Sequence, residues 1–220
     1  LAVFLTLWGC LRLFHNRPLM SLVRPKGKFS WQKVLFSGSL WFLLAATSDL
    51  VWAVINPSNY QWSFNAKSFF LFLLPALILV PIQTSTEELV FRSYLTQWMG
   101  RYTQKLWLPL LVPSLIFMLM HGLNPEVEVY GFWLTMPFYF SIGLLMSWVT
   151  VKTGGLEMAL GLHAANNLYA SLIITFPNSA LPSPALCSIQ IYEPVGALVQ
   201  QSIVMVVYLC IVYLVKRQWL

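Results

Sequence analysis

Apolar residues occur along this chain in long unbroken runs, separated by short polar stretches. A transmembrane helix needs about 20 mainly apolar residues, and runs that are continuous rather than alternating exclude a membrane β-barrel. The pattern predicts an all-α, polytopic membrane helix bundle of about seven spans, the first of them truncated. We place the spans at residues 1–14, 34–55, 68–98, 106–121, 129–151, 156–175 and 195–215.

The connections between the runs differ in charge. Residues 56–67, 122–128 and 176–194 contain Lys67 as their one basic residue, whereas the stretches 15–33, 100–105, 152–155 and the C-terminus are basic. Basic connections face the cytoplasm in most membrane proteins. We therefore expect a multi-pass integral membrane protein whose basic loops and C-terminus are cytoplasmic.

Composition supports a single membrane domain covering residues 1–220. Hydrophobic residues make up 58% of the chain and charged residues 9%, against about 25% charged in soluble domains. The net charge of +6 comes from residues between the apolar runs, so we expect contact with a lipid bilayer and no binding of nucleic acid. Cys10, Cys187 and Cys210 form no disulfide pattern.

Polar residues that interrupt the runs fall into three clusters: Glu87, Glu88 and Arg92; His121; and His163, Asn166 and Asn167. A charge at the centre of a bilayer costs about 3 kcal/mol and usually marks function. With a rise of about 1.5 Å per residue, the clusters lie roughly 21, 24 and 16 Å from the basic loops. These depths allow one common site, nearer the outer face than the inner one.

Spacing within the helices suggests separate roles. Glu88 and Arg92 are i,i+4 neighbours and can pair, as are His163 and Asn167, which project from one face. Glu87 is left without a local partner and suits a general base, with one histidine orienting the same water. The second histidine and the amide could donate to an oxyanion. Alternatively, these side chains hold a divalent metal such as zinc.

Each cluster also has a structural interpretation, as the polar end of a span, an interfacial histidine or an interhelical hydrogen bond. All three being structural at once is less favoured, because two of the three histidines fall in these clusters. Asp49 and Glu157 have no motif around them. We assign both to structural pairing or to a vestibule.

The motifs Glu87-Glu88-x-x-x-Arg92, Phe117-x-x-x-His121 and His163-x-x-x-Asn167 resemble the three-motif signature of the CPBP family. This family comprises the CAAX prenyl endopeptidases and their bacterial bacteriocin-processing and self-immunity relatives, also called Abi proteins. The similarity covers about residues 80–170, and Gly154-Gly155-Leu156 is also similar to many bacterial members.

The resemblance implies an intramembrane endopeptidase of the CAAX-protease type, acting on a peptide or protein substrate in a bacterial plasma membrane. Carried over by position, Glu87 and His121 would activate water, and His163 and Asn167 would stabilise the oxyanion. Glu88 and Arg92 would support the site. The family is described both as metalloproteases and as glutamate proteases, so a zinc ion on Glu87, His121 and His163 stays open.

Two other classes of function remain as alternatives. A non-catalytic immunity or peptide-binding membrane protein of the same fold would follow from the family's self-immunity branch. A transporter or a bis-histidine haem protein would follow from charges and two histidines inside the membrane.

Overall fold

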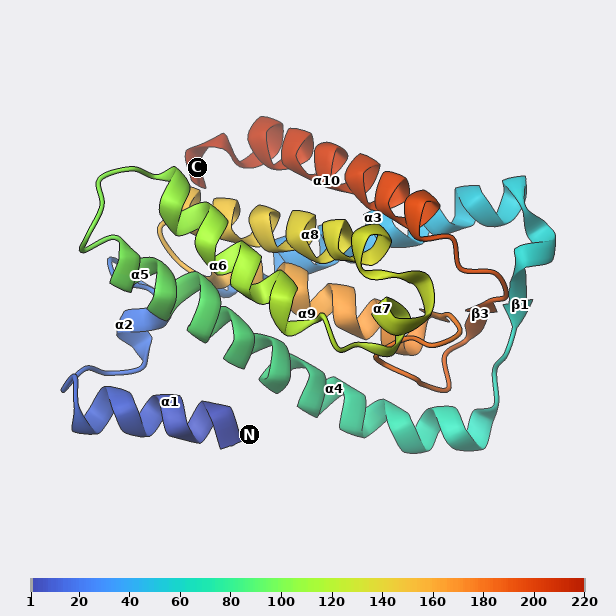
Figure 1. Cartoon of the computed structure of the whole chain (residues 1–220), viewed down its shortest axis with the longest axis horizontal. Coiled ribbons are helices and arrows are strands. Elements are labelled where there is room, and N and C mark those ends of the chain that lie inside the picture. Colours follow the sequence, from blue (N-terminus) through green and yellow to red (C-terminus); the bar gives the residue numbers. More distant parts are fainter. Residues whose placement is uncertain (1, 220) are drawn as a thin grey trace.

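The computed structural model describes residues 2–219 as a bundle of helices that lie side by side (Figure 1). The predicted all-α polytopic bundle is confirmed. The longer helices are α1 Ala2–Leu13, α3 Trp31–Ile55, α4 Ala66–Glu88, α6 Trp107–Met120, α8 Phe132–Thr153, α9 Glu157–Leu172 and α10 Pro194–Lys216.

Helix lengths divide the seven predicted spans into two groups. Within the described residues, four helices are long and apolar enough to cross a membrane: Trp31–Ile55, Ala66–Met99, Phe132–Thr153 and Pro194–Val215. Helices α1 and α6 are apolar but shorter. Helix α9 has 16 residues and is largely buried among the others, so it needs less apolar surface than a lipid-facing span.

The third predicted span departs from α geometry at a place that the sequence did not indicate. Pro75 and Pro81 lie inside α4 without ending it. The chain instead widens into a π-helical turn, η2, at Leu89–Leu95, and continues as α5 Thr96–Met99. Such turns are rare and occur often at functional sites. This one follows Glu88 directly.

The connections contain more structure than predicted. Short helices occur at α2 Met20–Val23 and α7 Pro125–Tyr130, and a single 3-10 turn at each of η1 Pro57–Asn59 and η3 Arg217–Trp219. Strands β1 Tyr60–Trp62, β2 Ile174–Thr175 and β3 Cys187–Ile189 form a small sheet in the order β1-β3-β2. Strand β3 pairs antiparallel with β1 and parallel with β2. The sheet joins the loops at 56–67 and 176–194.

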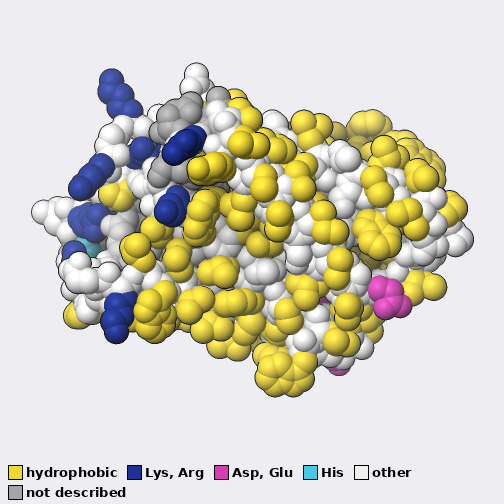
Figure 2. Space-filling model, turned by 90° about the horizontal axis from the view of Figure 1, so that it is seen from above, with side chains coloured by type: hydrophobic (Ala, Val, Ile, Leu, Met, Phe, Trp, Pro, Cys, Tyr) yellow, Lys and Arg dark blue, Asp and Glu magenta, His cyan; other side chains and the backbone are white. Residues whose placement is uncertain are grey.

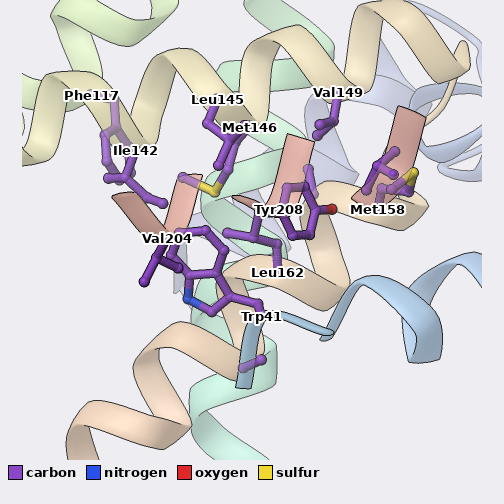
Figure 3. Packing of buried hydrophobic residues seen from close by; sticks show 13 residues of the cluster. Trp41, Phe117, Ile142, Leu145, Met146, Val149, Met158, Leu162, Val204 and Tyr208 are labelled. Atoms are coloured by element: carbon purple, nitrogen blue, oxygen red, sulfur yellow. The ribbon is translucent and has the colours of Figure 1, made fainter. Parts of the chain in front are cut away.

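The main hydrophobic core lies between α3, α8, α9 and α10 (Figure 3). Its fully buried members include Val149, Met158, Leu162, Tyr208 and Val212. Helices α3 and α9 approach closely where Gly38 faces Gly161. A Cβ atom added at Gly161 would lie 2.0 Å from the Val34 carbonyl oxygen, so only glycine fits there.

Charge distinguishes the two ends of the bundle. Lysine and arginine side chains gather at one end of the surface in Figure 2, and acidic side chains appear toward the other. We call the first the basic end; it carries α2, the α5–α6 loop and the C-terminus in Figure 1. We call the other the sheet end, after strands β1–β3. Exposed apolar side chains cover the surface between them, as expected for contact with lipid.

Candidate active site

Glu88 connects two of the three predicted clusters. Its side chain is fully buried at the end of α4. Oxygen Oε1 accepts hydrogen bonds from Arg92 Nη1 at 2.9 Å and from His163 Nδ1 at 2.6 Å. The i,i+4 pair with Arg92 is as predicted, whereas the bond to His163 on α9 is a tertiary contact that spacing alone did not reveal.

Arg92 is held in the interior by a carboxylate and a ring. It is 1% exposed, and its guanidinium lies over the Phe117 ring with Cζ 4.0 Å from the centroid. Gly143 on α8 makes the room for both. A Cβ atom there would come within 3.2 Å of Arg92 Nη2 and of Phe117 Cδ1. A buried charge is stable only when paired, so Glu88 and Arg92 depend on each other.

Glu87 is the freer of the two carboxylates. Its side chain is 24% exposed, against 0% for Glu88. Oxygen Oε1 accepts a hydrogen bond from Gln83 Nε2 at 2.8 Å. Oxygen Oε2 has no hydrogen-bond partner and lies 3.8 Å from His163 Nε2. Glu87 is thus the more exposed acid, but Gln83, four residues earlier on α4, gives it a local partner that the sequence prediction did not include.

His121 follows the last turn of α6 with a fixed tautomer. Its Nδ1 lies 2.8 Å from the Phe117 carbonyl oxygen, which can only accept, so Nδ1 carries the proton. Nitrogen Nε2 then holds a lone pair and can accept a proton. The Phe117 ring lies 4.5 Å from the His121 ring and 5.9 Å from the His163 ring, centroid to centroid. The two histidines thus flank one phenylalanine.

Asn167 is oriented by a chain of hydrogen bonds that starts on α3. Trp41 Nε1 donates to Asn166 Oδ1 at 3.1 Å, and Asn166 Nδ2 donates to Asn167 Oδ1 at 3.1 Å. This arrangement leaves Asn167 Nδ2 as a free donor. Trp41 was not among the predicted site residues, because nothing near it in the sequence marks it as more than an apolar helix residue.

A cavity of about 400 Å³ is lined by residues of the second and third clusters, whereas Glu87, Glu88 and Arg92 are not among its lining residues. His121, His163, Asn166 and Asn167 lie on its wall, and Gln83, the partner of Glu87, lies beside them. On α3, α8, α9 and α10, most lining residues belong to the half of each helix nearer the sheet end, and Trp41, Met146 and His163 lie just beyond the middle of their helices. Further lining residues come from the segment 174–192. The cavity therefore extends from the histidines toward the sheet end.

Glu126 is a cavity residue that the sequence did not single out. It lies in the predicted connection 122–128 between two apolar runs, yet it is only 4% exposed. Oxygen Oε1 accepts hydrogen bonds from the Tyr139 hydroxyl and from Asn124 Nδ2. The Tyr139 ring in turn stacks on His121, with centroids 4.4 Å apart. Helix α7 folds back against α8, and this packing buries the acid.

Asp49 and Glu157, the two acids that we assigned to structural pairing or to a vestibule, both have partners. Asp49 accepts hydrogen bonds from Tyr60, Tyr169 and Gln200 and lines the cavity. Burial, and then the Asp49 carboxylate, raise the pKa of Tyr60, so this phenol remains a donor.

Glu157 lies at the basic end of the bundle, 3.4 Å from Arg24 Nη1. It also accepts a hydrogen bond from the Ser30 amide. Asp49 and Glu157 therefore both have structural partners, and Asp49 contributes to the cavity wall as well.

The geometry does not provide a metal site at the three predicted ligands. Across residues 2–219, no group of three or more His, Cys, Asp or Glu side chains is placed to hold a metal ion. Glu87, His121 and His163 do not form a ligand set in this arrangement, and no step below depends on a metal.

Comparison with known proteins agrees with the motifs. The sequence model of the Rce1-like family, type II CAAX prenyl endopeptidases, matches residues 66–169, which include all six predicted site residues. The match covers nearly half of the chain and supports the family resemblance that the motifs carry.

A curated relative, the uncharacterized protein YyaK of Bacillus subtilis (strain 168), is 40% identical over 174 residues. The match takes in 78% of this chain and 58% of that protein, so the chain spans little more than half the length of its relative. No solved structure matches.

Proposed function

We propose that the chain is an intramembrane endopeptidase that hydrolyses a peptide bond in a hydrophobic or membrane-associated peptide. One observation carries the proposal. Oxygen Oε2 of Glu87 has no hydrogen-bond partner and lies 3.8 Å from His163 Nε2, beside a cavity whose wall carries His121 and Asn167. A free carboxylate beside free imidazole and amide groups is an arrangement for proton transfer and oxyanion binding.

Glu87 and His121 are the groups that activate water in this mechanism. Glu87 Oε2 accepts a proton as the water oxygen attacks the carbonyl carbon of the substrate, and the lone pair of His121 Nε2 accepts the second hydrogen bond of that water. The carbonyl oxygen becomes an oxyanion. Glu87 then returns the proton to the leaving nitrogen as the C–N bond breaks, so the carboxylate is restored at the end of the cycle.

His163 and Asn167 stabilise the oxyanion. Asn167 donates through Nδ2, the nitrogen left free by the Trp41–Asn166–Asn167 chain. His163 already donates through Nδ1 to Glu88, so it can offer Nε2–H only as an imidazolium. A charged donor strengthens the hydrogen bond to the oxyanion. Glu88 and Arg92 hold this imidazole in place and do not contact the substrate.

The membrane setting follows from the same proposal. We place the protein in a bacterial plasma membrane with the basic end in the cytoplasm, in line with the positive-inside rule. Because the cavity extends toward the sheet end, the peptide reaches the site from the opposite face. A segment lying in or on the outer leaflet is the expected form of the substrate.

The decisive experiment compares the proteome of membranes that carry the wild-type protein with that of membranes carrying Glu87→Ala. We expect uncleaved precursors to accumulate with the variant, and cleavage of a precursor by the purified variant to fall at least about a hundredfold. Glu128→Gln is the matched control, because Glu128 is an exposed acid outside the cavity. A folded Glu87→Ala protein that cleaves at the wild-type rate would exclude this mechanism.

A further inference from the structure

The cavity is acidic in a protein that is otherwise basic. The chain carries a net charge of +6, yet the residues that line the cavity include Asp49 and Glu126 and, within the described part of the chain, no lysine or arginine; the proposed His163 imidazolium, which Glu88 holds, balances one of these two acids. Low-dielectric walls concentrate the field of such charges inside a cleft. The cavity therefore favours a positively charged occupant.

The two acids differ in how well they are satisfied. Asp49 accepts three hydrogen bonds through its two oxygens. Glu126 engages Oε1 with Tyr139 and Asn124, while Oε2 is buried with no hydrogen-bond partner. A buried carboxylate oxygen without a donor is costly, and native proteins rarely leave one unsatisfied without a reason. A donor on a bound molecule would remove this cost.

Glu126 is also close to the proposed chemistry. Tyr139 donates a hydrogen bond to Glu126 and stacks on His121, so one side chain separates the acid from the water-activating imidazole. A cation bound at Glu126 would thus lie near the reacting bond. Apolar wall residues, among them Phe138, Ile142 and Val204, can accommodate the neighbouring side chains of a hydrophobic peptide.

We propose that Glu126 binds a cationic group of the substrate, a lysine ammonium or an arginine guanidinium, so that the enzyme selects a hydrophobic peptide with a basic residue beside the cleaved bond. This inference rests on the proposed peptidase function and specifies its substrate. Asp49 contributes charge to the same cavity, but its hydrogen bonds assign it chiefly to fixing Tyr60, Tyr169 and Gln200.

The test measures binding, so that it does not depend on catalysis. The probes are N-acetylated, C-amidated hydrophobic heptapeptides with lysine at one position each, and matched peptides with norleucine there. Wild type and Glu87→Ala, in nanodiscs of zwitterionic phosphatidylcholine, capture peptides from equimolar pairs, and mass spectrometry gives the ratios. We expect lysine to be favoured about tenfold or more at one position in both proteins, the range of a charge-assisted hydrogen bond.

Two variants test whether the preference for lysine peptides comes from Glu126. Glu126→Gln, whose amide oxygen can still accept from Tyr139, should bring the ratio to about one, because only the charge is lost. Glu128→Gln removes the same charge two residues away on the exposed side of α7 and should keep the wild-type ratio. An unchanged ratio in Glu126→Gln, an equal fall in Glu128→Gln, or no lysine preference in the wild type would overturn the inference.

A second measurement needs no folded variant. A water-soluble carbodiimide joins a lysine amine to a carboxylate in contact with it, so wild type with bound lysine peptide should give an amide bond to Glu126. A cross-link to Glu128 or Asp49 instead would overturn the inference. Lysine-selective binding with no cleavage of any peptide would remove the peptidase and leave the cation site, so the two failures can be told apart.

Discussion

Helices α3, α8, α9 and α10 pack tightly toward the basic end of the bundle and surround a cavity toward the sheet end. Toward the basic end, α8, α9 and α10 meet through Val149, Met158, Leu162, Tyr208 and Val212, all fully buried. Toward the sheet end, the same helices and α3 separate around the polar cavity. The proposed catalytic groups lie where one half meets the other. His163 contacts buried Glu88 through Nδ1 and faces the cavity side with Nε2.

This difference explains how polar groups are positioned in a membrane. The packed half excludes water, which strengthens the hydrogen bonds that Glu88 makes to Arg92 and His163. The hollow half keeps Nε2 of His121 and Nδ2 of Asn167 available for a substrate. A site at the boundary obtains rigidity from one side and access from the other. Substitutions in the boundary, the hollow half and the packed half should therefore have different consequences.

The largest effect is expected at the boundary, with Arg92→Ala. This change leaves Glu88 as an unpaired buried charge, and breaking a buried ion pair typically costs about 3–5 kcal/mol. We expect both the free energy of unfolding in mixed micelles and the cleavage rate to fall. Arg101→Ala, in the exposed α5–α6 loop, is the control and should change neither. A stable, active Arg92→Ala protein would contradict the boundary assignment.

Asn167→Ala tests the hollow half. Loss of one oxyanion donor should lower the cleavage rate by a factor of about 100–1,000. Because the Asn167 amide faces the cavity and its lost partner Asn166 can turn to the same space, the unfolding temperature should change little. Asn166→Ala keeps that donor but removes the bond that orients it, together with the acceptor of Trp41 Nε1, and should cost about tenfold in rate. Equal losses in the two variants would argue against Asn167 as the donor.

Gly161→Ala tests the packed half and should have the smallest effect on the proposed chemistry, because it acts through stability. The new methyl group would meet the backbone of Val34, so α3 and α9 must separate, at a cost of about 1–3 kcal/mol in stability. Gly196→Ala is the matched control. Its methyl group would be in ordinary contact, 3.6 Å from Glu193 Cβ, and should leave stability unchanged or slightly raised. Thermal unfolding of both variants in the same detergent gives the comparison.

Much of the fold could be predicted because lipid imposes a simple rule on sequence. Continuous apolar runs marked the seven longer helices of the described residues, and basic residues marked one end of the bundle. Local spacing also gave the Glu88–Arg92 pair. These features depend on residues a few positions apart, whose relation is fixed by helix geometry.

Features that depend on packing between distant segments were not predicted. Glu126 belongs to a short polar stretch, and only the contact of α7 with Tyr139 on α8 makes it a cavity residue. Trp41 acts through Asn166, 125 positions away in the sequence. The sheet of β1, β2 and β3 forms because two loops meet at one end of the bundle. No local sequence pattern predicts such contacts between segments that are far apart in the chain.

The π-helical turn at Leu89–Leu95 changes the direction in which side chains point along the helix formed by α4, η2 and α5. One surplus residue in a turn rotates everything after it by roughly 100° relative to the part before it. Before the turn, Glu88 faces His163 on α9. Within the turn, Ser93 donates to the Leu22 carbonyl oxygen, and after it Gln97 accepts from Arg17. One continuous helix can thus direct its carboxylates toward α9 and fix its basic end against the N-terminal segment independently.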